Sequence, residues 1–251
     1  MGVRRGPLTG PNPTDRGTWG PKIHLCTEQN GLPLPHLLRG GGESKGVRGG
    51  RDRLRAERVR FGTTFLCAGS VTGMSDELPG FPYHPDPLAT GAVVASGTTC
   101  VCCGRARGFI YAGPVYAVEE LSRLLCPWCI ADGSAAATYD ADFIGDPIGD
   151  DVPLEVVMSV GACTPGFSSW QDPQWFFHCG DGAAFMGAVG AAELVAFPDA
   201  REELRSEADA WGWSAEAVES YLGALDKDSQ PTGYLFMCRT CGRYMAYADS
   251  T

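Results

Sequence analysis

The sequence predicts an α+β fold, a small zinc-stabilised domain with a treble-clef-like finger and a second C-x-x-C-G knuckle hairpin. Two observations lead to this prediction. Paired cysteines recur at the spacing of metal ligands, and aromatic-rich strand patterns are interspersed with short helical patterns. Such interspersion fits an α+β class better than the regular alternation of a parallel sheet. The sequence contains no run of 18 apolar residues, so we expect no membrane span.

The charge of the chain is unevenly distributed. The 251 residues carry 20 basic and 30 acidic side chains, a net charge of −10. Residues 1–73 contribute 12 basic and 5 acidic side chains, a net of +7, whereas residues 74–251 contribute 8 and 25, a net of −17. Because nucleic acids are polyanions, the acidic C-terminal part argues against nucleic acid as a partner.

Residues 1–73 are expected to form a disordered extension rich in glycine and arginine. This stretch holds 15 of the 34 glycines and sustains no apolar periodicity, so it cannot bury enough apolar surface to fold. The composition changes sharply at Met74, which suggests that Met74 is the biological start and that the upstream residues come from a mis-assigned start codon. A basic tail that binds nucleic acid is the alternative for this stretch.

Residues 74–251 are expected to form one domain, with a first zinc finger at residues 100–135 and a second lobe at residues 150–251. The spacing of apolar residues predicts helices at residues 115–125, about 199–210 and 214–225, the last two capped by Asp199 and Ser214. Aromatic and β-branched runs predict strands at residues 108–111, 154–160 and 175–177, and a hairpin at residues 234–247.

The first predicted zinc site consists of Cys100, Cys103, Cys126 and Cys129. Two thiolates separated by two residues converge on one tetrahedral ion when the backbone makes a tight knuckle, and the glycine after Cys103 permits the positive φ that such a knuckle needs. Four thiolates leave no open coordination position, so we expect a structural zinc site. Cys102 is a spare thiol of this knuckle.

The Cys126-Pro-Trp-Cys129 motif has a redox alternative. A C-P-x-C sequence at the start of a helix is also typical of thiol-disulfide exchange, because the helix N-terminus lowers the pKa of the first thiol. Such a motif needs a buried strand before it, whereas residues 115–125 have helical spacing. We therefore favour a metal site over a redox dithiol.

The second predicted zinc site starts from Cys238 and Cys241, with Cys179 as the expected third ligand. His178, Cys163 and Asp181 are further candidates. Adjacent residues of a strand point to opposite faces, so we do not expect His178 and Cys179 to bind the same ion. Three ligands and an open position would make the site catalytic, and four ligands would make it structural, which we favour.

Aromatic and polar residues of the loop from Trp170 to Asp181 form the first candidate for a pocket, with Trp175 and His178 within it. Packing of the tryptophans between two lobes is an equally good interpretation. His84 lies in a proline-fixed segment, where a structural turn is favoured over a role at a pocket rim.

Several long motifs together resemble the CbrC family. They include Phe81-Pro-Tyr-His84-Pro-Asp-Pro87, Leu125-Cys-Pro-Trp-Cys-Ile-Ala-Asp-Gly-Ser134, Thr164-Pro-Gly-Phe-Ser-Ser-Trp-Gln171 and Tyr234-Leu-Phe-Met-Cys-Arg-Thr-Cys-Gly. The resemblance spans about residues 80–251. It implies a bacterial protein of a family without an established biochemical activity, which begins close to the Phe81 motif.

These observations predict a cytoplasmic protein that binds two Zn²⁺ ions and acts as an interaction or binding module for an unknown protein or small-molecule partner. Cytoplasmic location follows from the absence of a recognisable secretory signal in this sequence, since thiols stay reduced there. The main alternative is a zinc-dependent enzyme with an open second site near the loop from Trp170 to Asp181.

Overall fold

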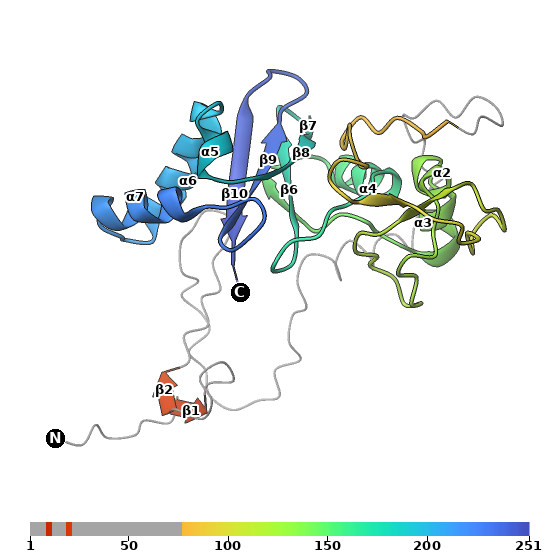
Figure 1. Cartoon of the computed structure of the whole chain (residues 1–251), viewed down its shortest axis with the longest axis horizontal. Helices are drawn as coiled ribbons and strands as arrows, with labels where there is room; N and C mark the ends of the chain where they lie inside the picture. The colour runs from red at the N-terminus through yellow and green to blue at the C-terminus, as the bar shows by residue number, and fades with distance from the viewer. Residues whose placement is uncertain (1–8, 12–18, 22–76, 251) are drawn as a thin grey trace. The chain divides into compact units, whose positions relative to one another are not determined.

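A computed structural model describes residues 9–11, 19–21 and 77–250 of the chain (Figure 1). The chain divides into two compact units, Met1–Val47 and Arg48–Thr251. In the first unit, strands β1 (Thr9–Pro11) and β2 (Trp19–Pro21) pair antiparallel. Apart from these two strands, the extension predicted for residues 1–73 and the start predicted at Met74 lie outside the described residues.

The second unit mixes helices and short strands in the α+β manner that the sequence predicts. Its elements in chain order are β3 (Val93–Ala95), β4 (Phe109–Tyr111), α2 (Pro127–Ala131), α3 (Ser134–Tyr139), β5 (Asp146–Gly149), α4 (Leu154–Cys163), β6 (Gln174–His178), β7 (Asp181–Gly182), β8 (Ala184–Val189), α5 (Ala191–Leu194), α6 (Pro198–Ala210), α7 (Ala215–Ala224), β9 (Thr232–Met237) and β10 (Tyr244–Asp249).

Three small sheets organise this unit. Strands β3 and β4 form an antiparallel hairpin, and β5 pairs parallel with β6, which pairs antiparallel with β7. Strand β9 lies at the centre of the third sheet, antiparallel to both β8 and β10. Figure 1 shows helices α5, α6 and α7 beside this third sheet, and β6 on its other side.

Side chains along β9 and β10 point alternately to the two faces of the third sheet, and both faces are buried. Phe236 and Met245 point into an aromatic core shared with β6, whereas Leu235 and Ala246 point into a core shared with α5, α6 and α7. Successive side chains of a strand face opposite sides, so a strand buried on both faces must be apolar throughout. Tyr234, Leu235 and Phe236 of β9 meet this requirement, and the buried hydroxyl of Thr232 at the strand's start donates a hydrogen bond to the Asp226 carbonyl over 3.0 Å.

A separate core surrounds the first cysteine group. Ile110 and Tyr111 of β4, Leu125, and Trp128 and Ile130 of α2 are all buried in it. The sulfurs of Cys100, Cys126 and Cys129 belong to the same cluster. Three cysteines of the first group therefore lie inside an apolar core, and the half-buried Cys103 packs against it.

Most predicted elements are confirmed, including the strand at residues 108–111, the strand at residues 175–177, and the hairpin of β9 and β10. Helix α7 begins after Ser214, whose hydroxyl accepts a hydrogen bond from the Ala217 amide as predicted. Helix α6 is also confirmed, but Asp199 lies within its first turn and Phe197 is the residue that precedes the helix.

Two predicted elements are wrong. Residues 115–125 are not helical, because a bridge between Tyr116 and Asp142 holds the chain extended and Arg123 has a φ of 55°. Residues 154–160 belong to helix α4 instead of a strand. Its buried side chains Val157 and Val160 follow helical spacing, and the β-branched residues of this segment concealed that spacing in the sequence.

His84 is completely buried and hydrogen-bonded at both ring nitrogens. Its Nδ1 lies 2.6 Å from the Pro165 carbonyl oxygen, its Nε2 lies 2.7 Å from Thr90 Oγ1, and the ring packs edge-on against Phe185. A carbonyl only accepts hydrogen bonds, so Nδ1 carries a proton and the neutral ring accepts from Thr90 at Nε2. Burial lowers the pKa of His84 to about 4, against the opposing effects of Pro165 and Asp86.

We therefore expect acid to destabilise the fold through His84. The unfolded histidine binds a proton near pH 6.5, but the buried one does not until about pH 4. The contribution of His84 to the unfolding free energy is therefore complete above pH 6.5. About 3 kcal/mol of it is lost as the pH falls to 4. Urea unfolding of the wild type and of His84→Gln at pH 7.5, 6, 5 and 4 measures the effect.

The difference in unfolding free energy between the two proteins should shrink as the pH falls, because only the wild type carries this histidine. Other acid-sensitive groups are common to both proteins and cancel in the difference. A difference that stays constant from pH 7.5 to pH 4 would contradict the assignment of His84 as a buried neutral ring.

Candidate metal centres

Side chains that ligate metals gather at two places in the part of the chain that the structure describes. One group consists of Cys100, Cys103, Cys126 and Cys129, and the other of His178, Cys179, Cys238 and Cys241. In each group the four donor atoms all lie within 4.8 Å of one another. The seven cysteines of the two groups are free thiols, as is Cys102.

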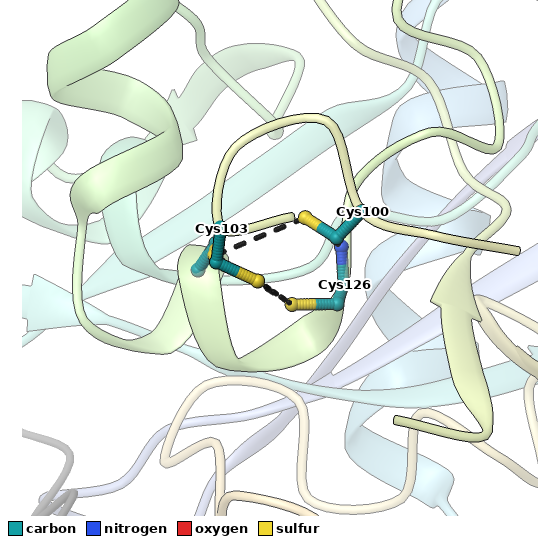
Figure 2. Close-up of side chains that lie close together, drawn as sticks. Cys100, Cys103 and Cys126 are labelled. Carbon is teal, nitrogen blue, oxygen red and sulfur yellow. Dashed lines mark hydrogen bonds between the residues drawn. The ribbon is translucent and has the colours of Figure 1, made fainter. Parts of the chain in front are cut away.

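The first group joins two separate segments of chain. Cys100 and Cys103 lie in the knuckle between β3 and β4, while Cys126 precedes α2 and Cys129 lies within it. Figure 2 shows the sulfurs of Cys100, Cys103 and Cys126 pointing toward one another. The Cys126 amide donates a hydrogen bond to Cys100 Sγ over 3.2 Å, which fixes the start of α2 against the knuckle.

The spacing of these sulfurs fits a tetrahedral metal ion. Cys126 Sγ lies 3.6 Å from Cys129 Sγ and 3.7 Å from Cys103 Sγ, and Cys100 Sγ lies 3.9 Å from Cys129 Sγ. Four sulfurs bound at about 2.3 Å from a central zinc would be separated by about 3.8 Å. A disulfide would need about 2.05 Å, so these cysteines are not oxidised in pairs.

The protonation of this group reflects the crowding of its sulfurs. Hydrogen bonds from the thiols of Cys126 and Cys129 lower the pKa of Cys100 well below its ordinary value. The shared hydrogen bond with Cys100 in turn raises the pKa of Cys126 to about 12, and the pKa of Cys129 rises for the same reason. Without a metal, S–H···S hydrogen bonds keep the four sulfurs close together. A bound cation would do the same by replacing the shared protons.

The second group contains a knuckle with the same backbone as the first. The Cys100 amide donates to the Arg105 carbonyl and the Gly104 amide to the Cys100 carbonyl, at 2.9 and 2.8 Å. Cys238 bonds to Arg243 and Gly242 to Cys238 in the same way, at 2.8 and 2.9 Å. Gly104 and Gly242 have φ values of 68° and 76°, a conformation that favours glycine.

His178 and Cys179 both belong to the second group, so the expectation that they point apart is wrong. His178 Nδ1 lies 3.2 Å from Cys179 Sγ and 3.6 Å from Cys241 Sγ. Strand β6 ends at His178, and Cys179 has a φ of 54°, which turns its side chain back toward the knuckle. The Cys179 amide donates to Asp150 Oδ2 over 2.9 Å, which helps to hold this turn.

The two groups differ in their exposure to solvent. Cys100, Cys126 and Cys129 are buried and Cys103 is half-buried, whereas Cys179 and Cys241 are exposed and only Cys238 of the second group is buried. Burial raises the pKa of Cys238, but a hydrogen bond from the Cys241 amide and the contact with His178 outweigh it and lower the pKa to about 6. Cys238 is therefore the residue of the second group that is both buried and lowered in pKa.

Asp181 and Cys163, the other ligand candidates, lie outside both groups. Cys163 ends helix α4. Asp181 accepts hydrogen bonds from Tyr83 Oη at 2.8 Å and from the Arg239 guanidinium at 2.7 Å, and that guanidinium lies 4.5 Å over the Tyr83 ring. Because Arg239 is part of the second knuckle, this contact ties the knuckle to the segment that contains His84. Sequence reasoning missed this contact: Tyr83 and Arg239 both lie within the motifs noted above, but those motifs are far apart in the chain and do not indicate that the two residues meet.

The residues proposed as a pocket have separate roles in the structure. Trp175 is completely buried and donates from Nε1 to the Ala183 carbonyl over 3.1 Å. Trp170 is 43% exposed, but its Nε1 donates to Thr232 Oγ1 over 2.8 Å. His84 is buried in the core, as described above. The burial of His84 and Trp175 favours the packing interpretation over a shared pocket.

Comparisons with other sequences add an identity without a known activity. Among the described residues, no helix is both long and apolar enough to cross a membrane. No solved structure matches the chain significantly. The model of the uncharacterised protein family UPF0167 matches residues 78–250.

The chain is similar to curated relatives over most of their length. It is 48% identical over 180 residues to the UPF0167 protein Mb2317 of Mycobacterium bovis and to MT2352 of Mycobacterium tuberculosis, which covers 71% of this chain and 96% of each relative. It is 43% identical over 173 residues to PA1536 of Pseudomonas aeruginosa, covering 68% of this chain and 96% of that protein. The resemblance to the CbrC family noted above is compatible with these matches. The chain belongs to the uncharacterised protein family UPF0167.

Proposed function

We propose that this chain is a zinc-binding protein that holds two structural ions and acts as an interaction module. The observation that carries the proposal is the convergence of two complete sets of four donors, Cys100, Cys103, Cys126 and Cys129 in one and His178, Cys179, Cys238 and Cys241 in the other. Thiolates and imidazoles in tetrahedral sets of four are the ligands typical of structural zinc. We assign both ions as zinc on this chemistry.

The geometry of the first group supports a treble-clef-like finger. Its knuckle lies in the hairpin of β3 and β4, and its second pair of cysteines lies at the start of helix α2. An ion bound here would link a hairpin to a helix inside an apolar core. Such an ion contributes directly to folding, because the unfolded chain has no preformed site.

Two alternatives are disfavoured on specific grounds. An open catalytic zinc at the second group would need one ligand fewer, but His178 supplies a fourth donor beside the three thiols. A redox pair of Cys126 and Cys129 alone would leave Cys100 and Cys103 unexplained, although their sulfurs lie as close to this pair as its members lie to each other. Structural metal binding accounts for all four sulfurs at once.

A cytoplasmic location is consistent with this proposal. Eight of the described cysteines are free thiols, several within 4 Å of another sulfur, as expected in a reducing compartment, whereas Cys163 is disulfide-bonded. Four donors in each group would leave no coordination position open to a partner. An interaction module would therefore bind its partner at another surface.

Metal analysis tests the proposal directly. We expect the full chain, purified in reductant, to contain two zinc ions. The double variant Cys100→Ser/Cys103→Ser and the double variant Cys238→Ser/Cys241→Ser should each retain one, because each loses half of one donor set and keeps the other set intact. Mass spectrometry of the metal content and the thiolate absorption of the cobalt-substituted protein measure both numbers.

Cys102→Ser is the matched control. Cys102 lies in the first knuckle, but its sulfur is 3.7 Å from Ser134 Oγ and 3.9 Å from Thr138 Oγ1, and it is outside the donor set. Its variant should keep two ions. Wild-type protein without bound metal, or a Cys102→Ser variant that loses an ion while Cys100→Ser/Cys103→Ser does not, would refute the assignment.

The difference in exposure predicts an order of metal release. With a chromogenic chelator in excess, we expect half of the zinc to leave in a fast phase and half in a slow phase. The fast phase should come from the second group, since water and chelator reach Cys179 and Cys241 but not the buried sulfurs of the first group.

The two double variants identify the phases. The protein that lacks Cys238 and Cys241 should retain only the slow phase, and the protein that lacks Cys100 and Cys103 only the fast one. Release of both ions in a single phase from the wild type would show that exposure does not control exchange at these groups.

A further inference from the structure

Helices α6 and α7 are neighbours in the fold (Figure 1), and an exposed aromatic cluster lies at the turn between them. It consists of Trp211, Trp213 and Tyr221. Trp211 is 49% exposed and Trp213 is 43% exposed, and Tyr221 is half-buried beneath them. Two tryptophans side by side on a surface are unusual, because tryptophan has the largest apolar area to remove from water.

The cluster is a fixed structure. The three rings pack edge to face, with centroids 5.1 Å apart for Trp211 and Trp213, 5.3 Å for Trp213 and Tyr221, and 6.1 Å for Trp211 and Tyr221. Gly212 between the tryptophans has a φ of 79°, and Ser214 caps α7 directly after them. The surface therefore presents its aromatic faces without the cost of ordering a loop on binding.

The surroundings of the cluster are strongly acidic. Residues 198–225, which contain α6, the cluster and α7, carry seven acidic and two basic side chains. Both basic residues, Arg201 and Arg205, pair with Glu219. Glu207, Asp209 and Glu216 lie exposed within four residues of Trp211 or Trp213 in the sequence. A shallow depression beside α6 is lined by Asp199, Glu202, Glu203, Ser206 and the basic Arg243, which pairs with Glu203.

This charge excludes three classes of partner. Nucleic acids and anionic membranes are attracted by basic surfaces and repelled by acidic ones. A second copy of this chain on a two-fold axis would place the same acidic patch against itself. A protein segment that carries arginine is complementary to both the tryptophans and the carboxylates. Its guanidinium groups pair with carboxylates and stack on the faces of tryptophan.

We propose that Trp211, Trp213 and Tyr221, with the carboxylates around them, form a docking surface for an arginine-bearing basic segment of another protein. This inference gives the interaction module a class of partner. The docking surface lies on α6 and α7 and includes no metal ligand. The peptide-binding experiment can therefore fail while the metal analysis succeeds, and the reverse.

Binding of a nine-residue oligoarginine peptide tests the proposal. Fluorescence anisotropy of the labelled peptide, at an ionic strength of about 0.15 M to suppress long-range attraction, should give saturable binding to the full chain. The double variant Trp211→Ala/Trp213→Ala, which leaves every charge in place, should weaken the affinity about tenfold, since each stacked guanidinium contributes a cation–π contact. Trp211→Phe/Trp213→Phe should recover part of the loss.

Val195→Ala is the matched control, because Val195 is an exposed apolar side chain on the same unit at 80% exposure and lies outside the cluster. It should bind as the wild type does. Thermal unfolding of each variant separates a lost surface from a lost fold. If the double alanine variant does not fold, Asp209→Asn/Glu216→Gln replaces it, and this variant should also weaken binding several-fold.

Three results would overturn the proposal. Equal affinity of the wild type and the folded double alanine variant would mean that diffuse charge alone attracts the peptide. Equal affinity of the asparagine–glutamine variant would mean that the carboxylates take no part. A wild-type dimer that becomes a monomer on loss of the two tryptophans would mean that a second copy of the chain occupies this surface.

Discussion

The first core of this fold depends on the convergence of four sulfurs at the junction of a hairpin and a helix. Cys100 and Cys103 come from the knuckle between β3 and β4, and Cys126 and Cys129 from the start of α2, yet their sulfurs approach to within 3.6–3.9 Å. Sulfurs this close must share protons or a cation. Neither element is long enough to be stable alone, since β4 has three residues and α2 has five. The short hairpin and helix therefore need both the sulfur cluster and the surrounding apolar core to be stable.

The second group has the same kind of knuckle, at the turn between β9 and β10. Its knuckle joins β9 to β10 with the hydrogen bonds of the first knuckle, and His178 and Cys179 bring the end of β6 to it. The aromatic core lies between β6 and β9, so the donor set closes that core at one edge. Arg239 extends the connection to Asp181 and Tyr83. Both groups thus connect segments that are distant in sequence, as structural metal sites do.

The sequence predicted the grouping of the cysteines better than the local path of the chain. The C-x-x-C-G spacing is enforced by the geometry of one tight turn, so the two knuckles and their glycines could be located from the residues alone. His178 was a candidate for the second group, but it was not expected beside Cys179 because strand alternation was applied to both residues. The strand ends between them, with a φ of 54° at Cys179. The helix predicted at residues 115–125 failed for a similar reason, since a non-local bridge to Asp142 overrides the local apolar pattern.

The central claim is that each donor set encloses one zinc ion, and anomalous scattering at the zinc absorption edge tests it most directly. A crystal of the full chain should give two peaks in the anomalous difference map. One should be surrounded by Cys100, Cys103, Cys126 and Cys129, and the other by His178, Cys179, Cys238 and Cys241, each at ligand distances of about 2.0–2.3 Å. Absence of a peak from either set, or a zinc bound by other residues, would contradict the account.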